Sequence, residues 1–222
     1  MPLPRIAVLV SGRGSNLQAL LDAIADGRLP AQVAGVFSDR PDAPALQRVP
    51  AELRWSADAR AFPDRAAFDA ELAGAVAACR PDWIFCAGYM RILGPDFVQR
   101  FVGRLLNVHP SLLPLYKGLR THARALAAGD AEHGASVHFV NTELDGGAVV
   151  AQARIPILPG DTPETLAERL LPQEHRLVVA VMQLAVAGRL AERDGKARVD
   201  GQCLFRPLQL GSDGVLSAAS RD

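Results

Sequence analysis

The sequence is poor in several features that mark particular classes of protein. Only two lysines, Lys117 and Lys196, occur among the 24 basic residues, and neither lies in a glycine-rich loop. This speaks against a P-loop NTPase and leaves few candidates for Schiff-base chemistry. The three cysteines are far apart and form no C-x-x-C pair, which excludes a zinc ribbon or a disulfide scaffold. No stretch longer than 12 residues is free of Asp, Glu, Lys and Arg, whereas a membrane-spanning helix needs about 20 apolar residues.

The formal charges balance, because 24 lysines and arginines face 24 aspartates and glutamates. Proteins that bind a nucleic-acid backbone usually carry a basic excess, so we expect small-molecule substrates and no nucleic-acid partner. The N-terminal apolar run 6–10 is too short for a signal peptide. With neither a signal peptide nor a membrane span, the sequence predicts a soluble cytoplasmic protein.

Apolar residues, by contrast, are plentiful: 49% of the 222 residues are hydrophobic. The 19 glycines and 16 prolines are too few for a disordered or collagen-like chain. A chain of this length buries roughly 70–75% of its unfolded surface and needs no disulfide or structural metal to hold a core. The composition therefore predicts a globular protein of one domain or two closely joined ones.

Short apolar runs alternate with helical patterns through the first half of the chain. We predict buried strands at 6–10, 33–37, 83–87 and 105–108, and helices at 16–25, 65–78 and 95–101. This alternation indicates an α/β fold, Rossmann-like, with a mostly parallel twisted sheet and helices on both faces. Ligands of such sheets bind in the loops that follow the carboxyl ends of the strands.

The second half is less regular. Its predicted parts are a long loop at 110–132 and two strands, 135–140 and 148–154, joined by residues 141–147. A helical stretch at 162–187 contains Pro172, which must kink or divide it. Residues 40–63 show no clear pattern. A main domain over residues 1–195 is followed by a mixed tail, 196–222, whose polar end is expected to fray.

A glycine-rich loop separates the first strand from the first helix. It reads Ser11-Gly12-Arg13-Gly14-Ser15-Asn16-Leu17. Glycines allow a close backbone approach, and a helix N-terminus offers free N–H groups and a partial positive charge, which suit a phosphate. Leu17 stands where a dinucleotide fingerprint has its third glycine, which favours a mononucleotide or sugar phosphate over NAD. The same residues also fit a plain strand-to-helix turn with Ser15 or Asn16 as the N-cap.

A candidate catalytic group lies at the end of the fourth predicted strand. Asn107 and His109 are two residues apart on this strand and so point to the same side. A carboxamide can donate to a developing oxyanion, and a histidine can move a proton near neutral pH. Asp145 in the run 143–147 could set the tautomer of His109 and stabilise its charged form. Taken alone, the first pair also fits a buried structural histidine beside a turn, and Asp-Gly-Gly also fits a hairpin turn.

Two further stretches carry weaker signals. Residues 88–93 follow a buried strand and fit either the floor of an apolar pocket or plain core packing. Glu174 follows Pro172 and fits either a functional carboxylate or the solvated first turn of a helix.

The order of these pieces resembles the phosphoribosylglycinamide formyltransferases, folate-dependent enzymes of purine synthesis. The resemblance spans roughly residues 5–190 and rests on SGRGSNLQALLDA (11–23), AGYMRIL (87–93), RLLNVHPSLLPLYKG (104–118), DAEHGASVHFV (130–140), ELDGGAVVAQ (143–152) and QEH (173–175). It implies a formyltransferase domain at 1–195, with a phosphate-binding N-terminal half and a folate cleft in the C-terminal half. The co-substrate it implies is 10-formyltetrahydrofolate, and no metal is required because the folate already activates the formyl group.

The resemblance also implies a role for each candidate residue. The phosphate of glycinamide ribonucleotide would lie on Gly14, Ser15 and Asn16, and its amine near Glu174. The catalytic residues would be Asn107, His109 and Asp145. The folate side would be formed by Met90, Arg91, Ile92 and Leu93 at the pterin end, by Asn107, and by Arg65 near the folate tail. Arg120 departs from the pattern, because a smaller or neutral residue is expected there.

Four other functions stay open at the level of the sequence. Three are enzymatic: hydrolysis of formyltetrahydrofolate, formyl transfer to methionyl-tRNA, and formylation of an amino sugar nucleotide. The fourth is a non-catalytic phosphate- or nucleotide-binding module. Such a module would keep the glycine-rich loop but would not need Asn107, His109 and Asp145 together.

Overall fold

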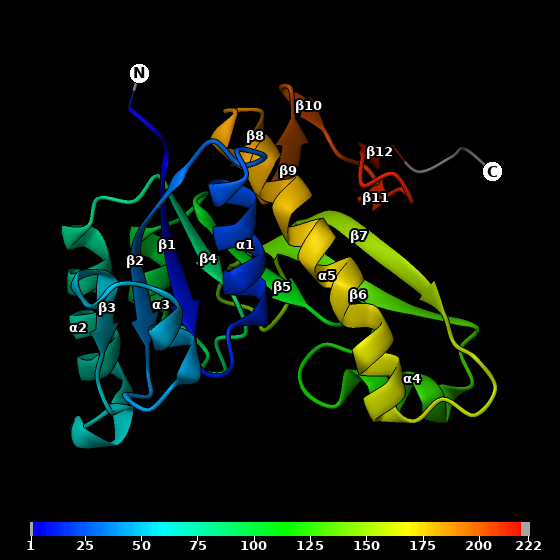
Figure 1. Cartoon of the computed structure of the whole chain (residues 1–222), viewed down its shortest axis with the longest axis horizontal. Helices are drawn as coiled ribbons and strands as arrows, with labels where there is room; N and C mark the ends of the chain where they lie inside the picture. The colour runs from blue at the N-terminus through cyan, green and yellow to red at the C-terminus, as the bar shows by residue number, and fades with distance from the viewer. Residues whose placement is uncertain (1, 219–222) are drawn as a thin grey trace.

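A sheet of nine strands forms the centre of the protein in the computed structural model, which describes residues 2–218 (Figure 1). The strand order across the sheet is β12-β11-β7-β6-β5-β4-β1-β2-β3. The strands are β1 (Arg5–Val10), β2 (Gln32–Ser38), β3 (Arg54–Ser56), β4 (Trp83–Cys86), β5 (Leu105–His109), β6 (Glu132–Phe139), β7 (Val149–Pro156), β11 (Leu208–Leu210) and β12 (Leu216–Ser217).

The first five strands of the chain are all parallel. β1 pairs with β2 and β4, β2 pairs with β3, and β4 pairs with β5. β6 then runs antiparallel to both β5 and β7. The predicted Rossmann-like, mostly parallel sheet is therefore confirmed. Because β1, β4 and β5 are parallel neighbours, the loops after their carboxyl ends meet at one edge of the sheet.

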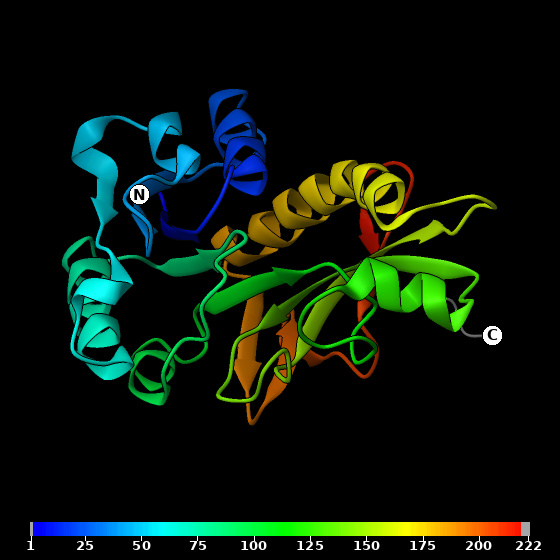
Figure 2. The ribbon, with the colours of Figure 1, turned by 90° about the horizontal axis from the view of Figure 1, so that it is seen from below.

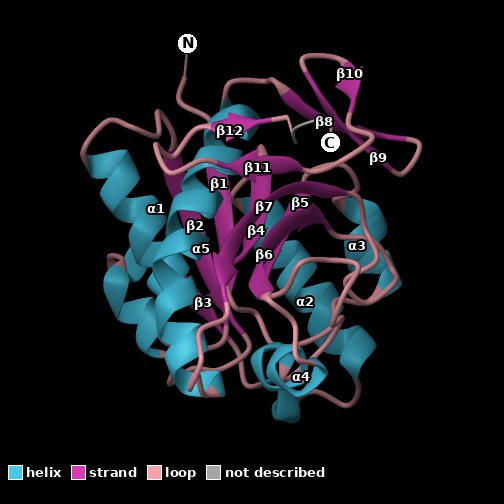
Figure 3. Ribbon diagram, turned by 90° about the vertical axis from the view of Figure 1, so that its right-hand side faces the viewer, coloured by secondary structure: helices cyan, strands magenta, loops and turns pink. Residues whose placement is uncertain are grey.

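Helices cover both faces of the sheet, as predicted (Figures 2 and 3). They are α1 (Ser15–Ala25), α2 (Arg65–Ala78), α3 (Pro95–Arg100), α4 (Thr121–Ala128) and α5 (Pro163–Val186). Along β1, Ile6 and Val8 belong to the core shared with α1 and α5, whereas Ala7 and Leu9 belong to the core shared with α2 and α3. Alternate side chains of the strand thus bury into two separate apolar layers.

The stretch 110–132, predicted as a loop, contains helix α4. The helix is short and buries only Thr121 and Ala125, so its apolar pattern is too weak to distinguish from a loop. Gly129, in the left-handed conformation at φ 70°, ends it. Residues 40–63, without a clear pattern in the sequence, form β3 and three short 3-10 helices at Pro44–Arg48, Ala51–Leu53 and Ala59–Ala61.

Of the two expected effects of Pro172, a kink or a division, the structure does not show the division: helix α5 runs through the proline. Pro172 lacks the N–H that would bond to the carbonyl of Glu168. Both residues lie on the exposed side of the helix, where water can solvate that carbonyl. One face of α5 stays buried on either side of the proline, from Leu170 to Leu177, so packing holds the helix together.

The chain after α5, including the tail 196–222, contributes further strands. β8 (Leu190–Arg193), β9 (Lys196–Val199) and β10 (Gln202–Cys203) form a small antiparallel sheet, and β11 extends the main sheet by pairing with β7. Of the polar end of the tail that was expected to fray, residues 219–222 lie outside the described residues. Across residues 2–218, no helix is both long and apolar enough to cross a membrane.

Candidate active site

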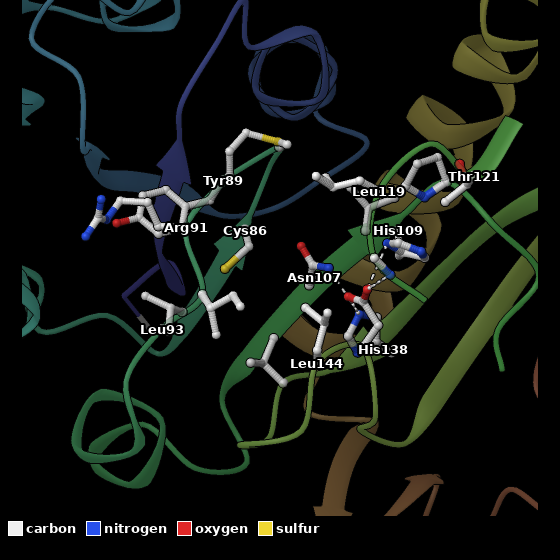
Figure 4. Close-up of a pocket in the computed structure, with 18 of the residues that line it drawn as sticks. Cys86, Tyr89, Arg91, Leu93, Asn107, His109, Leu119, Thr121, His138 and Leu144 are labelled. Atoms are coloured by element: carbon white, nitrogen blue, oxygen red, sulfur yellow. Dashed lines mark hydrogen bonds and ion pairs between the residues drawn. The ribbon is translucent and has the colours of Figure 1, made fainter. Parts of the chain in front are cut away.

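A cavity of about 430 Å³ lies beyond the carboxyl ends of β4 and β5 (Figure 4). Its walls come from the loop after β4, the end of β5, residues 118–122, His138 of β6 and the loop 140–145. Asn16 of α1 and Glu174 of α5 close one side of it. Segments that are far apart in the sequence therefore meet where this fold is expected to bind its ligands.

The structure brings Asn107, His109 and Asp145 together in this cavity. His109 is buried, and its Nδ1 lies 3.4 Å from Oδ2 of Asp145. Its Nε2 lies 3.0 Å from the backbone carbonyl of Tyr116. Both neighbours are hydrogen-bond acceptors, so a doubly protonated imidazolium can donate to both, whereas the neutral ring leaves one without a proton. Both nitrogens of the His109 ring therefore face hydrogen-bond acceptors.

Asp145 reaches His109 because the loop between β6 and β7 folds back over the sheet. Its backbone is left-handed, with φ 47°, and its Oδ2 accepts a 2.8 Å hydrogen bond from the N–H of Gly118. The loop depends on Gly147, where an added Cβ would lie 1.9 Å from the carbonyl oxygen of Phe139. The loop that joins the antiparallel strands β6 and β7 is therefore the same loop that places the Asp145 carboxylate at His109.

His138, which the sequence analysis missed, holds Asn107. The two residues face each other across the β5–β6 pairing, and Nδ2 of Asn107 lies 3.1 Å from Nε2 of His138. Nδ1 of His138 donates to the carbonyl of Phe139 at 2.7 Å, so in the neutral ring Nε2 is the acceptor. Burial lowers the pKa of His138 and favours that neutral ring. The Asn107 amide is thereby fixed with its N–H side toward His138.

The only sequence signal for His138 is its place in the run SVHFV, one residue from buried apolar neighbours. Its partner depends on the register of β5 against β6, which the strand pattern does not specify.

The glycine-rich loop, Ser11–Asn16, ends in an uncapped helix N-terminus. Gly14 is the N-cap, with φ 72°, and no side chain caps the helix, so the alternative of a turn capped by Ser15 or Asn16 is wrong. A Cβ on Gly14 would lie 2.5 Å from Cβ of Ala45. Glycine is needed both for the backbone angle and for this approach. The unsatisfied N–H groups of the first helical turn remain free to bind an anion.

Glu174 and Asn16 link this loop to the cavity. Nδ2 of Asn16 lies 3.4 Å from Oε2 of Glu174, while Oδ1 of Asn16 is buried without a hydrogen-bond partner among the described residues. Burial raises the pKa of Glu174 to about 7, although the Asn16 hydrogen bond acts in the opposite direction. Glu174 therefore changes its charge near neutral pH, and two polar groups face the cavity ready for a ligand.

The apolar wall of the cavity is formed by residues 90–93. Met90 and Ile92 are exposed to it, and Leu93 is buried beneath. The guanidinium of Arg91 lies 5.1 Å from the centre of the Phe68 ring. Arg65 is not part of the cavity wall; it begins α2 and faces Asp69 at 3.5 Å.

Arg120 also lines the cavity, where it directly precedes α4 with a left-handed φ of 57°. Across residues 2–218, no group of three or more His, Cys, Asp or Glu side chains is arranged to hold a metal ion.

A Rossmann-like sheet with polar side chains gathered beyond its strand ends is the architecture of an α/β enzyme. The family model described as formyl transferase matches residues 4–182. The chain is 46% identical over 201 residues to the phosphoribosylglycinamide formyltransferase of Escherichia coli (strain K12), covering 90% of this chain and 95% of that one. It is 44% identical over 204 residues to the enzyme of the same name from Haemophilus influenzae, covering 91% and 96%.

Solved structures agree with the sequence relatives. The phosphoribosylglycinamide formyltransferase of Coxiella burnetii superimposes with a TM-score of 0.87 at 43% identity, covering 91% of this chain and 96% of that one. The chain belongs to the formyl transferase family, whose members use a formyl-folate as co-substrate. The predictions of the family, the fold and an enzymatic function are confirmed.

Proposed function

We propose that the protein transfers the formyl group of 10-formyltetrahydrofolate to the amine of glycinamide ribonucleotide, giving formylglycinamide ribonucleotide. The observation that carries this proposal is the convergence of Asn107, His109 and Asp145 on a cavity that also reaches the glycine-rich loop through Asn16. The names of the relatives with more than 40% identity support the same pair of substrates.

The two substrates would enter from opposite sides of the polar group. The phosphate of the ribonucleotide fits the free N–H groups around Gly14, Ser15 and Asn16, and its amine fits beside Glu174. The pterin fits the apolar wall of Met90, Arg91, Ile92 and Leu93. These positions leave the formyl carbon of the folate facing Asn107 and His109.

Attack of the amine nitrogen on the formyl carbon forms a C–N bond and moves one electron pair onto the formyl oxygen. The amide N–H of Asn107, oriented by His138, donates to this oxyanion. The carboxylate of Glu174 accepts a hydrogen bond from the attacking amine, which must be neutral to react. Collapse of the intermediate breaks the bond to the folate nitrogen, which takes a proton from His109 directly or through water. Asp145 stabilises the charged form of His109 until this proton is transferred. The surplus proton of the former amine nitrogen leaves to water or returns to His109, so that the product is a neutral amide and His109 is protonated again.

The proposal is tested by following the loss of the formyl group by absorbance, with 10-formyltetrahydrofolate, in the presence and absence of glycinamide ribonucleotide. Loss that requires the ribonucleotide supports the transferase. Loss without the ribonucleotide identifies a hydrolase and contradicts the proposal. Absence of any reaction shows that the acceptor is wrong or that the protein only binds its ligands. The cytoplasmic location and the role of Arg65 stay predictions.

A further inference from the structure

The glycine-rich loop is held from behind by the short 3-10 helix Pro44–Arg48. The backbone N–H of Ala45 donates to the carbonyl of Gly12 at 3.1 Å. The side chain of Arg48 donates from Nε to the carbonyl of Arg13 at 2.8 Å and from Nη1 to Oε1 of Gln18 at 2.7 Å. Two successive carbonyls of the loop are therefore tied to one segment from elsewhere in the chain.

These two bonds determine where the loop directs its N–H groups. In a planar trans peptide the carbonyl and the following N–H point in opposite directions. Since the carbonyls of Gly12 and Arg13 face the 44–48 segment, the N–H groups of Arg13 and Gly14 face away from it. Neither N–H donates to an acceptor within residues 2–218. Successive N–H groups turned to one side form an anion-binding concavity, here continuous with the free N–H groups at the start of α1.

Arg48 also brings a positive charge to the side of the loop opposite the concavity. Its Nε lies 3.4 Å from the point where a Cβ of Gly14 would be. No carboxylate of the described residues forms a salt bridge with Arg48, and both of its side-chain partners are neutral oxygens. The guanidinium is therefore fixed in direction by two hydrogen bonds without being paired to a carboxylate.

We propose that Arg48 is the positioning residue of the phosphate site: it turns the Arg13–Gly14 peptide so that the loop presents its N–H groups to the ribonucleotide phosphate. This inference rests on the proposed function. The competing explanation is that Arg48 only attaches the 44–48 segment to the body of the protein.

Arg54 provides a matched control for that explanation. It donates from Nε and Nη2 to the carbonyl of Val49, at 2.8 and 2.6 Å, and from Nη1 to Oε1 of Gln47 at 3.1 Å. Arg54 thus holds the 44–48 segment and the residue after it without touching the loop. Loss of either arginine removes a bidentate set of bonds, but only Arg48 contacts the glycine-rich loop.

The experiment compares the wild type with Arg48→Ala, Arg48→Lys and Arg54→Ala. It measures kcat, the KM of each substrate, the Kd of glycinamide ribonucleotide by calorimetry without folate, and the melting temperature. Arg48→Ala is expected to raise the Kd and KM of the ribonucleotide about tenfold or more, the effect of losing a charge-assisted interaction. The KM of the folate and kcat are expected to stay within about twofold, because Arg48 is remote from the reacting atoms. Arg54→Ala is expected to lower the melting temperature but to leave every KM unchanged.

The dephosphorylated nucleoside separates a phosphate effect from a general loosening of the site. Its KM or inhibition constant is expected to be the same in the wild type and in Arg48→Ala. Arg48→Lys keeps the charge but cannot donate to two acceptors in the same geometry, so it is expected to recover part of the ribonucleotide affinity. This variant replaces Arg48→Ala in the comparison if Arg48→Ala does not fold.

The inference is overturned if either Arg48 variant binds the ribonucleotide as the wild type does, or if the nucleoside is weakened equally. If the wild type binds the ribonucleotide but does not formylate it, the proposed function fails while the binding data still decide the role of Arg48. If the wild type does not bind the ribonucleotide, both fail.

Discussion

The glycine-rich loop is made of consecutive residues, whereas the polar group around His109 gathers side chains from β5, β6 and the loop before β7. The loop acts through its backbone, and at Gly14 it has no room for a side chain. The polar group acts through side chains whose orientation depends on strand register and on a folded-back loop. One region is therefore sensitive to backbone shape and the other to hydrogen-bond partners, and substitutions in the two should affect different kinetic constants.

The largest effect is expected in the polar group. Asn107→Ala removes the amide donor, and His109→Ala removes the proton donor. Each is expected to lower kcat by about 10²–10³, the usual effect of losing one oxyanion donor. The Kd of the ribonucleotide, measured by calorimetry, is expected to change little. Near wild-type kcat in a folded His109→Ala protein would remove His109 from the reaction.

A smaller effect, on a different constant, is expected from Gly14→Ala in the loop. The new Cβ collides with Ala45, so the ribonucleotide KM is expected to rise about tenfold to a hundredfold while the KM of the folate is retained. Gly27→Ala is the matched control, because Gly27 also has a positive φ, 77°, but nothing lies within 4 Å of its Cβ position. Both variants suffer backbone strain of about 1 kcal/mol, and only the first should lose ribonucleotide affinity. Equal kinetic losses in the two would show that strain alone is responsible.

His138 tests whether the polar group depends on partners that do not touch the substrate. His138→Leu removes the acceptor that orients Asn107, and a fall of about tenfold in kcat is expected with both KM values unchanged. His138→Gln supplies an acceptor oxygen in a similar place and is expected to recover part of the rate. Identical rates in the two variants would show that His138 only fills space.

The smallest effect concerns Glu174, which joins the two regions. With its pKa raised to about 7, the carboxylate form is lost as the pH falls below 7, so kcat/KM is expected to decline there. Glu174→Gln is expected to lower kcat/KM several-fold above pH 7 and to make kcat/KM less dependent on pH below 7.

The raised pKa of Glu174 also stabilises the fold at low pH, and this contribution is lost as the pH rises through 7. Glu174→Gln should therefore show a smaller fall in melting temperature between pH 5 and 8 than the wild type.

Local patterns predicted local structure well. The helix expected at 65–78 has those bounds in the structure, because Asp64 caps a regular apolar stripe whose members include Phe68 and Leu72. Elements that depend on contacts with the rest of the fold were harder to predict from the sequence. Helix α4 has too few buried residues to leave a pattern, and α5 continues through Pro172 because its other face is packed.

The same division applies to the candidate site. Asn107 and His109 were predicted to share a side because they are two residues apart on one strand. The meeting of Asp145 with His109 was implied by a family resemblance, since nothing local distinguishes the loop from an ordinary hairpin turn. The hydrogen bond between Asn107 and His138 joins residues 31 positions apart, and the one from Arg48 to Arg13 joins residues 35 positions apart. No spacing in the sequence predicts either bond.

The carbonyl of Tyr116 accepts the proton side of Nε2 of His109, so this proton is not free to be donated elsewhere. A carbonyl oxygen only accepts hydrogen bonds, so Nε2 of His109 is the donor to this backbone carbonyl while the bond is formed. A water molecule beside a bound formyl group then meets a histidine whose Nε2 proton is already engaged. Release of that proton requires Tyr116, which has a left-handed φ of 55°, to give up the bond. Exchanging one acceptor for another changes the hydrogen-bond energy little, so a bound acceptor can replace the Tyr116 carbonyl at small cost in free energy.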